Sequence, residues 1–477
     1  MPQRHILLIT TDQQRFDTIA AAGAGHVLTP HLDWMCDRGI RFTRAYADSP
    51  ICGPSRHTIM TGRHAFHQQV NFNCWEPTPI DPRTTLAGLL TTSGFQTRAE
   101  GKMHFKTERN HLGFEHMELL ADYYREMARH GRPLPMDTGL GQNEMVPAIG
   151  TVHENDSLTR WIATRTCDLL DTRDPLRPFF CFTSFSKPHP PFDPPLSFWQ
   201  LYANRTMPEA IVGDWSRDAE TIAPGLRDLS LVLNSADRFP PETLRDARRA
   251  YHALITHVDY SIGHILARLR ELNLLDDTTI IFTSDHGDLL GDHRLGGKTV
   301  FLEGSAHLPF IVVPAKGVID DSLRGTTCDT LACLADVMPT LLGTVGVAMP
   351  EGRDGLDLLA VARGERAGRE VLHGEALAHH MVLEGRYKYI FCSAGPAELL
   401  FDLAADPHET RDLVRAGTHP AELARLRGLL LARLQESCHP AGKDGRLQAD
   451  RPTPVPRASR GSWPGFHSLV HPNDVCH

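Results

Sequence analysis

The sequence has no apolar run long enough to cross a membrane and no secretory leader at its start. The apolar segment nearest the N-terminus, Ile6–Ile9, has four residues, whereas a membrane span needs about 20. The ten cysteines are scattered through 477 residues, which is not the pattern of a disulfide framework. These absences predict a cytoplasmic protein that does not associate with membranes.

Positive charge is also scarce. The chain has 49 basic against 58 acidic residues, a net charge of −9, and only 7 of the basic residues are lysines. A negative chain is unsuited to binding nucleic acid, so we expect no nucleic-acid partner. Hydrophobic residues make up 41% of the chain and charged residues 22%, so a sizeable core can form. A length of 477 residues allows two or three domains.

Short apolar runs alternate with helical periodicity through most of the chain. The longest helical period runs from Tyr251 to Leu269, with apolar residues three and four apart. Alternation of this kind predicts an α/β fold with a mostly parallel sheet flanked by helices, and such sheets bind ligands beyond the carboxyl ends of their strands. The predicted buried strands are residues 6–11, 178–185, 279–284 and 309–313.

The pattern weakens into glycine- and charge-rich sequence around residues 345–370. We therefore predict a catalytic domain over residues 1–360 and a smaller α+β subdomain over 361–440, with a strand at 387–391 and a helix at 421–434. The last segment, 441–477, is rich in proline and has no period. We expect it to be an arm that rests on the body or on another subunit of a homo-oligomer, a dimer or tetramer.

Two acidic pairs follow predicted strands, namely Asp12-Gln13 and Asp285-His286. Acidic residues after strands are often only helix caps. Parallel strands, however, bring these two pairs to one edge of the sheet. Oxygen ligands from Asp and Gln suit Ca²⁺, Mg²⁺ or Mn²⁺, and a histidine favours a transition metal slightly. The pairs therefore predict a site for one divalent metal ion.

Between these pairs lies the segment Cys52-Gly-Pro-Ser-Arg56. Pro54 followed by good helix formers indicates the start of a helix, so Cys52 lies at a helix N-terminus, where free amides favour an anion. Arg56, one turn further, can add a bidentate donor for an oxyanion. A cysteine is more often a small buried apolar residue, but a cysteine just before such a helix start and followed by an arginine is a much rarer arrangement.

Cys52-x-Pro-Ser-Arg-x-x-x-x-Thr-Gly62 resembles the signature of the type I sulfatases, which have the alkaline-phosphatase-like fold. The resemblance extends over residues 5–435 in the expected order. Gly94-Phe95-x-Thr97-x-x-x-Gly101-Lys102-x-His104 resembles the second signature of this family. Asp12-Gln13 and Asp285-His286 match its metal positions, and the segments around Lys187-Pro-His189 and Lys298 match two further active-site segments.

The resemblance implies sulfate-ester hydrolysis. Cys52 would be oxidised to formylglycine by a formylglycine-generating enzyme, and its hydrate would attack the sulfur of a small-molecule sulfate ester. The metal would be Ca²⁺, with Mn²⁺ as the second choice, held by Asp12, Gln13, residue 52, Asp285 and His286. The other implied roles are orientation of the formylglycine by Lys102 and Arg56, protonation of the leaving alcohol by His189 or Lys298, and release of sulfate by His104. We also predict that Asn73 donates to a sulfate oxygen and that Lys187 contacts the substrate.

Other functions fit part of this pattern. Phosphonate monoester and phosphodiester hydrolases share the cysteine signature and both metal pairs, but typically lack the Lys and His that stand here as Lys102 and His104, which favours the sulfatase interpretation. A binding protein without activity is disfavoured because the metal, Lys and His positions are intact. A cysteine hydrolase would need a base paired with the unmodified thiolate, and no local signature of one appears. Gln13 stands where many sulfatases have a second Asp.

Overall fold

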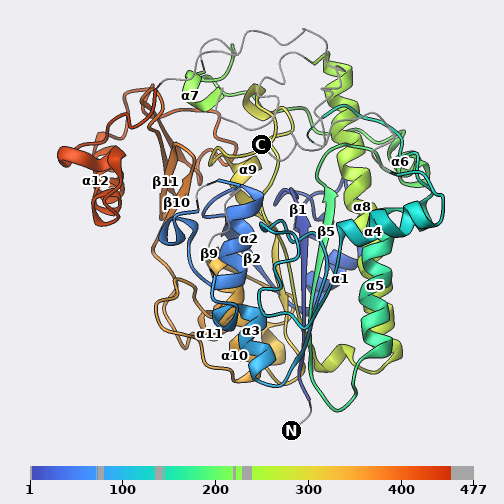
Figure 1. The fold of residues 1–477 in the computed structure, drawn as a ribbon. Coiled ribbons are helices and arrows are strands. Elements are labelled where there is room, and N and C mark those ends of the chain that lie inside the picture. The colour runs from blue at the N-terminus through green and yellow to red at the C-terminus, as the bar shows by residue number, and fades with distance from the viewer. Residues whose placement is uncertain are drawn as a thin grey trace.

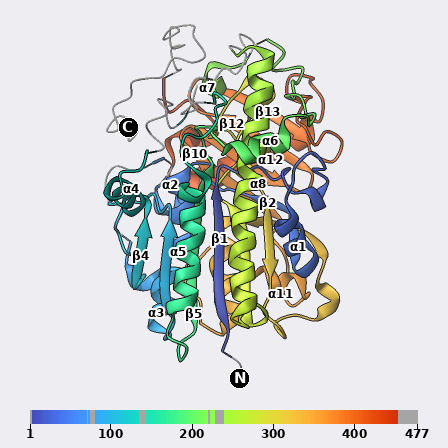
Figure 2. The ribbon, with the colours of Figure 1, turned by 90° about the vertical axis from the view of Figure 1, so that its right-hand side faces the viewer.

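The computed structural model describes residues 3–70, 72–73, 80–134, 143, 145–218, 222–227 and 239–452. Two β-sheets organise the chain. The larger has nine strands in the order β4-β3-β5-β1-β6-β8-β2-β7, with β9 paired to β2, and the smaller has four in the order β10-β11-β12-β13. Figure 1 shows the large sheet between two layers of helices, and Figure 2 shows the same layers after a 90° rotation. The predicted α/β fold with a smaller C-terminal α+β unit is confirmed.

The centre of the large sheet is parallel and buried on both faces. Strand β1 (His5–Asp12) lies between β5 (Phe179–Pro188) and β6 (Thr278–Ser284), and it is parallel to both. Helices on both sides explain why these strands appear in the sequence as continuous apolar runs rather than as alternating ones. The remaining strands are β2 (Ile40–Tyr46), β3 (Gln96–Gly101), β4 (His116–Leu119), β7 (His307–Leu308), β8 (Phe310–Val313) and β9 (Thr326–Cys333). All four predicted strands are confirmed.

Helices cover both faces of this sheet. On one side lie α2 (Cys52–Thr61), α3 (Leu86–Thr92) and α10 (Val337–Val345), and on the other α1 (Pro30–Arg38), α5 (Leu158–Thr172) and α8 (Pro241–Glu271) (Figures 1 and 2). The shorter or peripheral helices are α4 (Leu120–Arg129), α6 (Leu196–Tyr202), α7 (Pro224–Arg227), α9 (Glu303–Ala306) and α11 (Leu358–Ala362). Helix α8 begins ten residues before the predicted period, because its first turns are charged and partly exposed and so carry no apolar stripe.

The C-terminal unit is an antiparallel meander followed by a helix. It contains β10 (Val371–Ala376), β11 (His379–Glu384), β12 (Tyr387–Cys392), β13 (Ala397–Asp402) and α12 (Pro420–Glu436). The strand predicted at 387–391 and the helix predicted at 421–434 are confirmed. The domain boundaries at residues 360 and 440 stay predictions, and residues 453–477 of the predicted arm lie outside the described residues.

One hydrophobic cluster joins the two units. It combines Val300 and Phe301, from the loop before α9, with Met381 and Ile390 of the small sheet. Gly374 of β10 allows the closest approach, since a Cβ there would lie 2.4 Å from the Phe301 ring. The small sheet therefore packs directly on the loop that carries Lys298. Within the part of the chain described, no helix is long and apolar enough to cross a membrane.

Candidate active site

The site forms where β1 and β6 end side by side. In the parallel register Thr11 pairs with Ser284, so the next residues, Asp12 and Asp285, emerge together at the carboxyl edge of the sheet. The Asp285 amide donates to the Thr11 carbonyl at 3.2 Å, and the Gln13 amide donates to Asp285 Oδ1 at 3.0 Å. The two acidic pairs thus meet, as their positions after parallel strands predicted.

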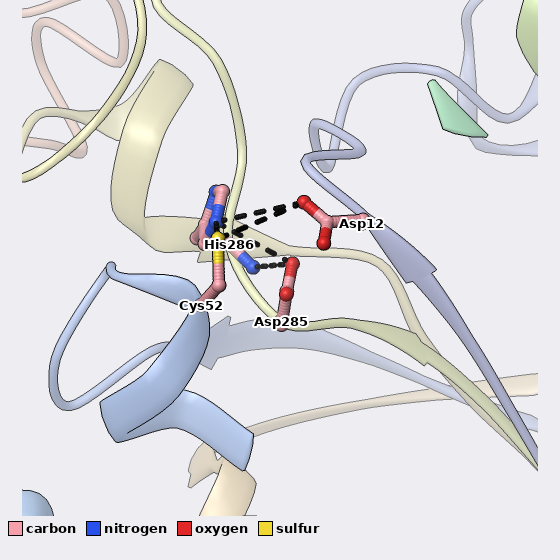
Figure 3. Close-up of side chains that lie close together, drawn as sticks. All are labelled: Asp12, Cys52, Asp285 and His286. Atoms are coloured by element: carbon pink, nitrogen blue, oxygen red, sulfur yellow. Dashed lines mark hydrogen bonds and ion pairs between the residues drawn. The ribbon is translucent and has the colours of Figure 1, made fainter. Parts of the chain in front are cut away.

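Four side chains converge at this edge, and we call them the Cys52 cluster: Asp12, Cys52, Asp285 and His286 (Figure 3). One potential ligand atom from each lies within 4.8 Å of the others, and all four residues are buried. Cys52 Sγ lies 3.1 Å from His286 Nε2 and 3.9 Å from Asp12 Oδ1. Two carboxylates and an imidazole form a donor set that fits Ca²⁺ or Mn²⁺.

The two carboxyl groups of the cluster have opposite pKa shifts. Burial and the charge of Asp12 raise the pKa of Asp285. Burial and Cys52 would raise the pKa of Asp12 too, but the positive charges of Lys102 and Arg56 outweigh them and hold it well below its usual value. Repulsion between two buried carboxylates is what a bound cation would relieve.

Cys52 is the first residue of helix α2, and every residue of that helix is buried. The Gly53 amide at this N-terminus donates to Asn73 Oδ1 at 2.9 Å. Burial alone would raise the pKa of the Cys52 thiol, but Lys298, His286 and Lys102 are positive and lower it well below its usual value. The side chain at position 52 therefore lies where negative charge is stabilised, as the helix-start pattern predicted.

Three further predicted residues contact Cys52 directly. Lys298, buried in the loop before α9, donates to Cys52 Sγ at 3.2 Å. The side chains of His104 and His189 lie beside the Cys52 side chain, close enough to interact with it. Burial and then the charges of Lys298 and Lys102 lower the pKa of His189 to about 4, so its imidazole is neutral near pH 7 in the free protein.

Lys102 and Arg56 contact the carboxylates of the cluster. Lys102 Nζ lies 2.6 Å from Asp12 Oδ2, and the Arg56 guanidinium lies 3.1 Å from Asp12 Oδ2 and 2.9 Å from Asp285 Oδ2. Arg56 also donates to the hydroxyl of Ser184 at 2.8 Å. The Arg56 guanidinium thus joins the carboxyl groups of Asp12 and Asp285, and binding of an oxyanion by Arg56 stays a prediction.

Lys187 and Asn73 have partners within the protein. Lys187 Nζ forms an ion pair with Asp193 at 2.5 Å and donates to the Pro191 carbonyl at 2.6 Å, so it holds the loop that carries His189. Asn73 accepts from the N-terminus of α2. Contact of either residue with substrate stays a prediction.

Gln13 and one residue that sequence reasoning missed complete the site. Gln13 Oε1 accepts from Lys298 Nζ at 2.7 Å, and Gln13 Nε2 donates to Asp288 Oδ2 at 2.5 Å. Asp288 is fully buried, and its position in the same post-strand segment, two residues after His286, was the signal that could have identified it. Ligation of a metal by Gln13 stays a prediction.

Comparison with known proteins agrees with this geometry. Residues 4–347 match the sequence profile of the Sulfatase family. The chain belongs to the sulfatase family.

Similar proteins include an arylsulfatase of Clostridium perfringens, 31% identical over 90% of this chain and 94% of that protein, and a choline-sulfatase of Rhizobium meliloti, 31% identical over 88% and 84%. Among solved structures, a phosphonate monoester hydrolase of Agrobacterium radiobacter superposes with a TM-score of 0.77 at 25% identity, covering 91% of this chain and 95% of that one. This sulfatase is therefore a sulfuric ester hydrolase of the alkaline-phosphatase-like superfamily.

Proposed function

We propose that this sulfatase hydrolyses small-molecule sulfate monoesters with a formylglycine made from Cys52 and one divalent cation. The supporting observation is the position of the Cys52 side chain, buried beside two carboxylates and His286 and 3.2 Å from Lys298 Nζ. A sulfate monoester needs charge neutralisation around sulfur, a nucleophile, and a proton for the leaving oxygen. This arrangement has a group for each requirement.

Asp12, Asp285, His286 and the side chain at position 52 would hold the cation, which we take to be Ca²⁺ with Mn²⁺ as the second candidate. Gln13 is a further ligand candidate through its carbonyl oxygen. When bound, the cation supplies Lewis-acid polarisation of oxygen atoms at the site. Lys102 and Arg56 contact the carboxyl groups of Asp12 and Asp285 and orient them for this purpose.

Formylglycine would supply the hydrated carbonyl whose hydroxyl oxygen attacks sulfur, so maturation needs a formylglycine-generating enzyme as partner. Lys298, which contacts residue 52, is placed to neutralise sulfate and to give a proton to the departing alcohol. His189 is the alternative donor of that proton, once the negative charge of a bound sulfate ester has raised its lowered pKa. His104, which lies beside the side chain of residue 52, is placed to take the hydroxyl proton as sulfate leaves. Cytoplasmic localisation and homo-oligomerisation stay predictions.

The test compares initial rates on an aryl sulfate and an aryl phosphonate monoester, with one preparation of the matured protein and with its Cys52→Ala variant as control. The proposal expects faster turnover of the sulfate and loss of that activity in the control. A faster phosphonate rate would replace it with the phosphonate monoester hydrolase alternative. Sulfate turnover that persists in Cys52→Ala would refute the role of residue 52.

A further inference from the structure

The Gln13 side chain lies between two charged groups of opposite sign. Its Oε1 accepts from Lys298 Nζ at 2.7 Å, and its Nε2 donates to Asp288 Oδ2 at 2.5 Å. Lys298 is 2% exposed, Gln13 is 1% exposed and Asp288 is fully buried, so water does not compete for these contacts. Gln13 is thus fixed at both ends of its carboxamide.

A carboxamide has two different ends, unlike the carboxylate of an aspartate at the same place. Only its oxygen can accept from an ammonium or ligate a cation, and its NH₂ group can only donate. Rotation of the terminal torsion by half a turn exchanges the two ends without changing the shape of the side chain. With glutamine at position 13, some neighbour has to select the productive orientation.

Asp288 makes that selection because both of its carboxyl oxygens accept hydrogen bonds here. Its Oδ2 takes the NH₂ end of Gln13, which leaves the oxygen of Gln13 facing Lys298. Its Oδ1 accepts from the Leu290 amide at 2.9 Å and from the Gly297 amide at 3.0 Å. Gly297 directly precedes Lys298, so Asp288 positions Lys298 in two ways. It holds the backbone at Gly297, and it orients Gln13, which accepts the hydrogen bond from Lys298.

We propose that Asp288 is a positioning residue that orients the Gln13 carboxamide with its oxygen toward Lys298 and the Cys52 cluster. This inference rests on the proposed function, in which Lys298 and the cation act on the sulfate ester. It explains how the site accommodates glutamine at a position where many sulfatases have aspartate. Asp288 acts through Gln13 and through the backbone next to Lys298.

The decisive change is Asp288→Asn, which replaces one acceptor oxygen by NH₂. The oxygen of the new side chain can still accept from Gly297 and Leu290, but its NH₂ group meets that of Gln13. The carboxamide of Gln13 then rotates and presents its NH₂ group to Lys298. We expect a fall of about 10- to 100-fold in kcat on an aryl sulfate, with a smaller change in KM.

The matched variant is the double substitution Gln13→Glu/Asp288→Asn, which has the same net charge as the natural pair. A carboxylate at position 13 accepts both from the new NH₂ group at 288 and from Lys298, so the hydrogen-bond pattern returns. We expect it to recover most of the lost kcat. A purely structural role for Asp288 would give no such recovery, because the original aspartate is still missing.

A second readout does not depend on turnover. Added Ca²⁺ or Mn²⁺ should raise the Tm of the natural protein and of the double variant, and raise that of Asp288→Asn less. If the natural protein does not hydrolyse sulfate esters, the proposed function fails, while the order of these Tm shifts still tests the orientation of Gln13.

Two results would overturn the inference. One is a kcat and a cation-induced Tm shift in Asp288→Asn that equal those of the natural protein, and the other is a double variant whose kcat is no higher than that of Asp288→Asn. If Asp288→Asn does not fold, the double variant alone tests the inference. Loss of both turnover and the cation-induced Tm shift in the double variant would then contradict it.

Discussion

Two buried groups of charged side chains differ in how their charges meet. The first, which we call the Lys388 cluster, lies where the small sheet contacts the large sheet. It consists of Glu303, His307, Lys388 and Glu409. Lys388 Nζ lies 2.7 Å from Glu303 and 2.6 Å from Glu409, and His307 Nδ1 lies 2.6 Å from Glu303. In the Cys52 cluster, by contrast, two carboxyl groups, an imidazole and a thiol face one another, and the side chains of Lys102 and Arg56 contact the carboxyl groups from outside the cluster.

The difference shows that burial of charge does not by itself mark an active site. The ammonium of the Lys388 cluster lies between its carboxylates, so its charges are compensated within the protein. Among the described residues, three or more potential ligand atoms converge in the Cys52 cluster and not in the Lys388 cluster. An arrangement that brings like charges together needs an additional cation, and this distinguishes a functional cluster from a structural one.

The largest expected effect is on stability, from Lys388→Met. The substitution leaves the carboxyl groups of Glu303 and Glu409 buried without a cation, which should cost about 3–5 kcal/mol in the free energy of unfolding. Denaturant unfolding measures it, with the exposed Lys316→Met as the control. An unfolding free energy equal to that of the control would mean that the Lys388 cluster is not the structural one of the two.

The next effect is on turnover, from Lys298→Ala. Loss of a preorganised donor beside residue 52 should lower kcat on an aryl sulfate roughly 100- to 1000-fold. Stability should fall less than in Lys388→Met, because this lysine belongs to the site and not to the interface between the sheets. Steady-state kinetics and unfolding on one preparation separate the two effects, and a natural kcat would remove Lys298 from the mechanism.

Removal of divalent cations should affect the Cys52 cluster alone. After dialysis against a chelator, added Ca²⁺ or Mn²⁺ should stabilise the protein by about 2.7 kcal/mol when the free cation is about 100 times its Kd. Differential scanning calorimetry measures the shift. Asp285→Asn should lose most of it, whereas Glu409→Gln should keep it. Equal cation shifts in the two variants would place the cation elsewhere.

The smallest expected effect is on the pH dependence of stability, through Glu409 of the Lys388 cluster. Burial raises the pKa of Glu409 from 4.5 to about 7, although Lys388 opposes the shift. The folded protein then keeps this proton to higher pH than the unfolded chain, so the carboxyl group lowers stability as pH rises from 4.5 to about 7. Glu409→Gln, which stays neutral, should gain a few degrees in Tm relative to the natural protein between about pH 5 and about pH 7.5. A constant Tm difference across this range would contradict this.

Much of the fold could be predicted because its buried strands leave an unmistakable pattern. Residues 6–11 and 279–284 are continuous apolar runs, and both are central strands covered on two sides. The N-terminal turns of α8 and three strands of the small sheet, β10, β11 and β13, were missed. Partly exposed turns carry no apolar stripe, and short alternating strands such as β10 resemble loop sequence.

The candidate site could be predicted where chemistry follows from strand ends and a helix start, as for Asp12, Asp285 and Cys52. Contacts made by long side chains were not accessible in this way. Arg56 is one turn into α2, and only the packed structure shows that its guanidinium reaches the carboxyl groups of Asp12 and Asp285. Asp288 was missed because its importance depends on which end of Gln13 it binds.

The most direct test of the central claim is the mass of the tryptic peptide covering residues 45–56, from protein produced together with a formylglycine-generating enzyme. We predict that this peptide carries an aldehyde at position 52, with the mass expected for formylglycine, and that the fraction of converted peptide scales with aryl sulfatase activity across preparations. A fully active preparation whose peptide retains an unmodified cysteine would contradict it.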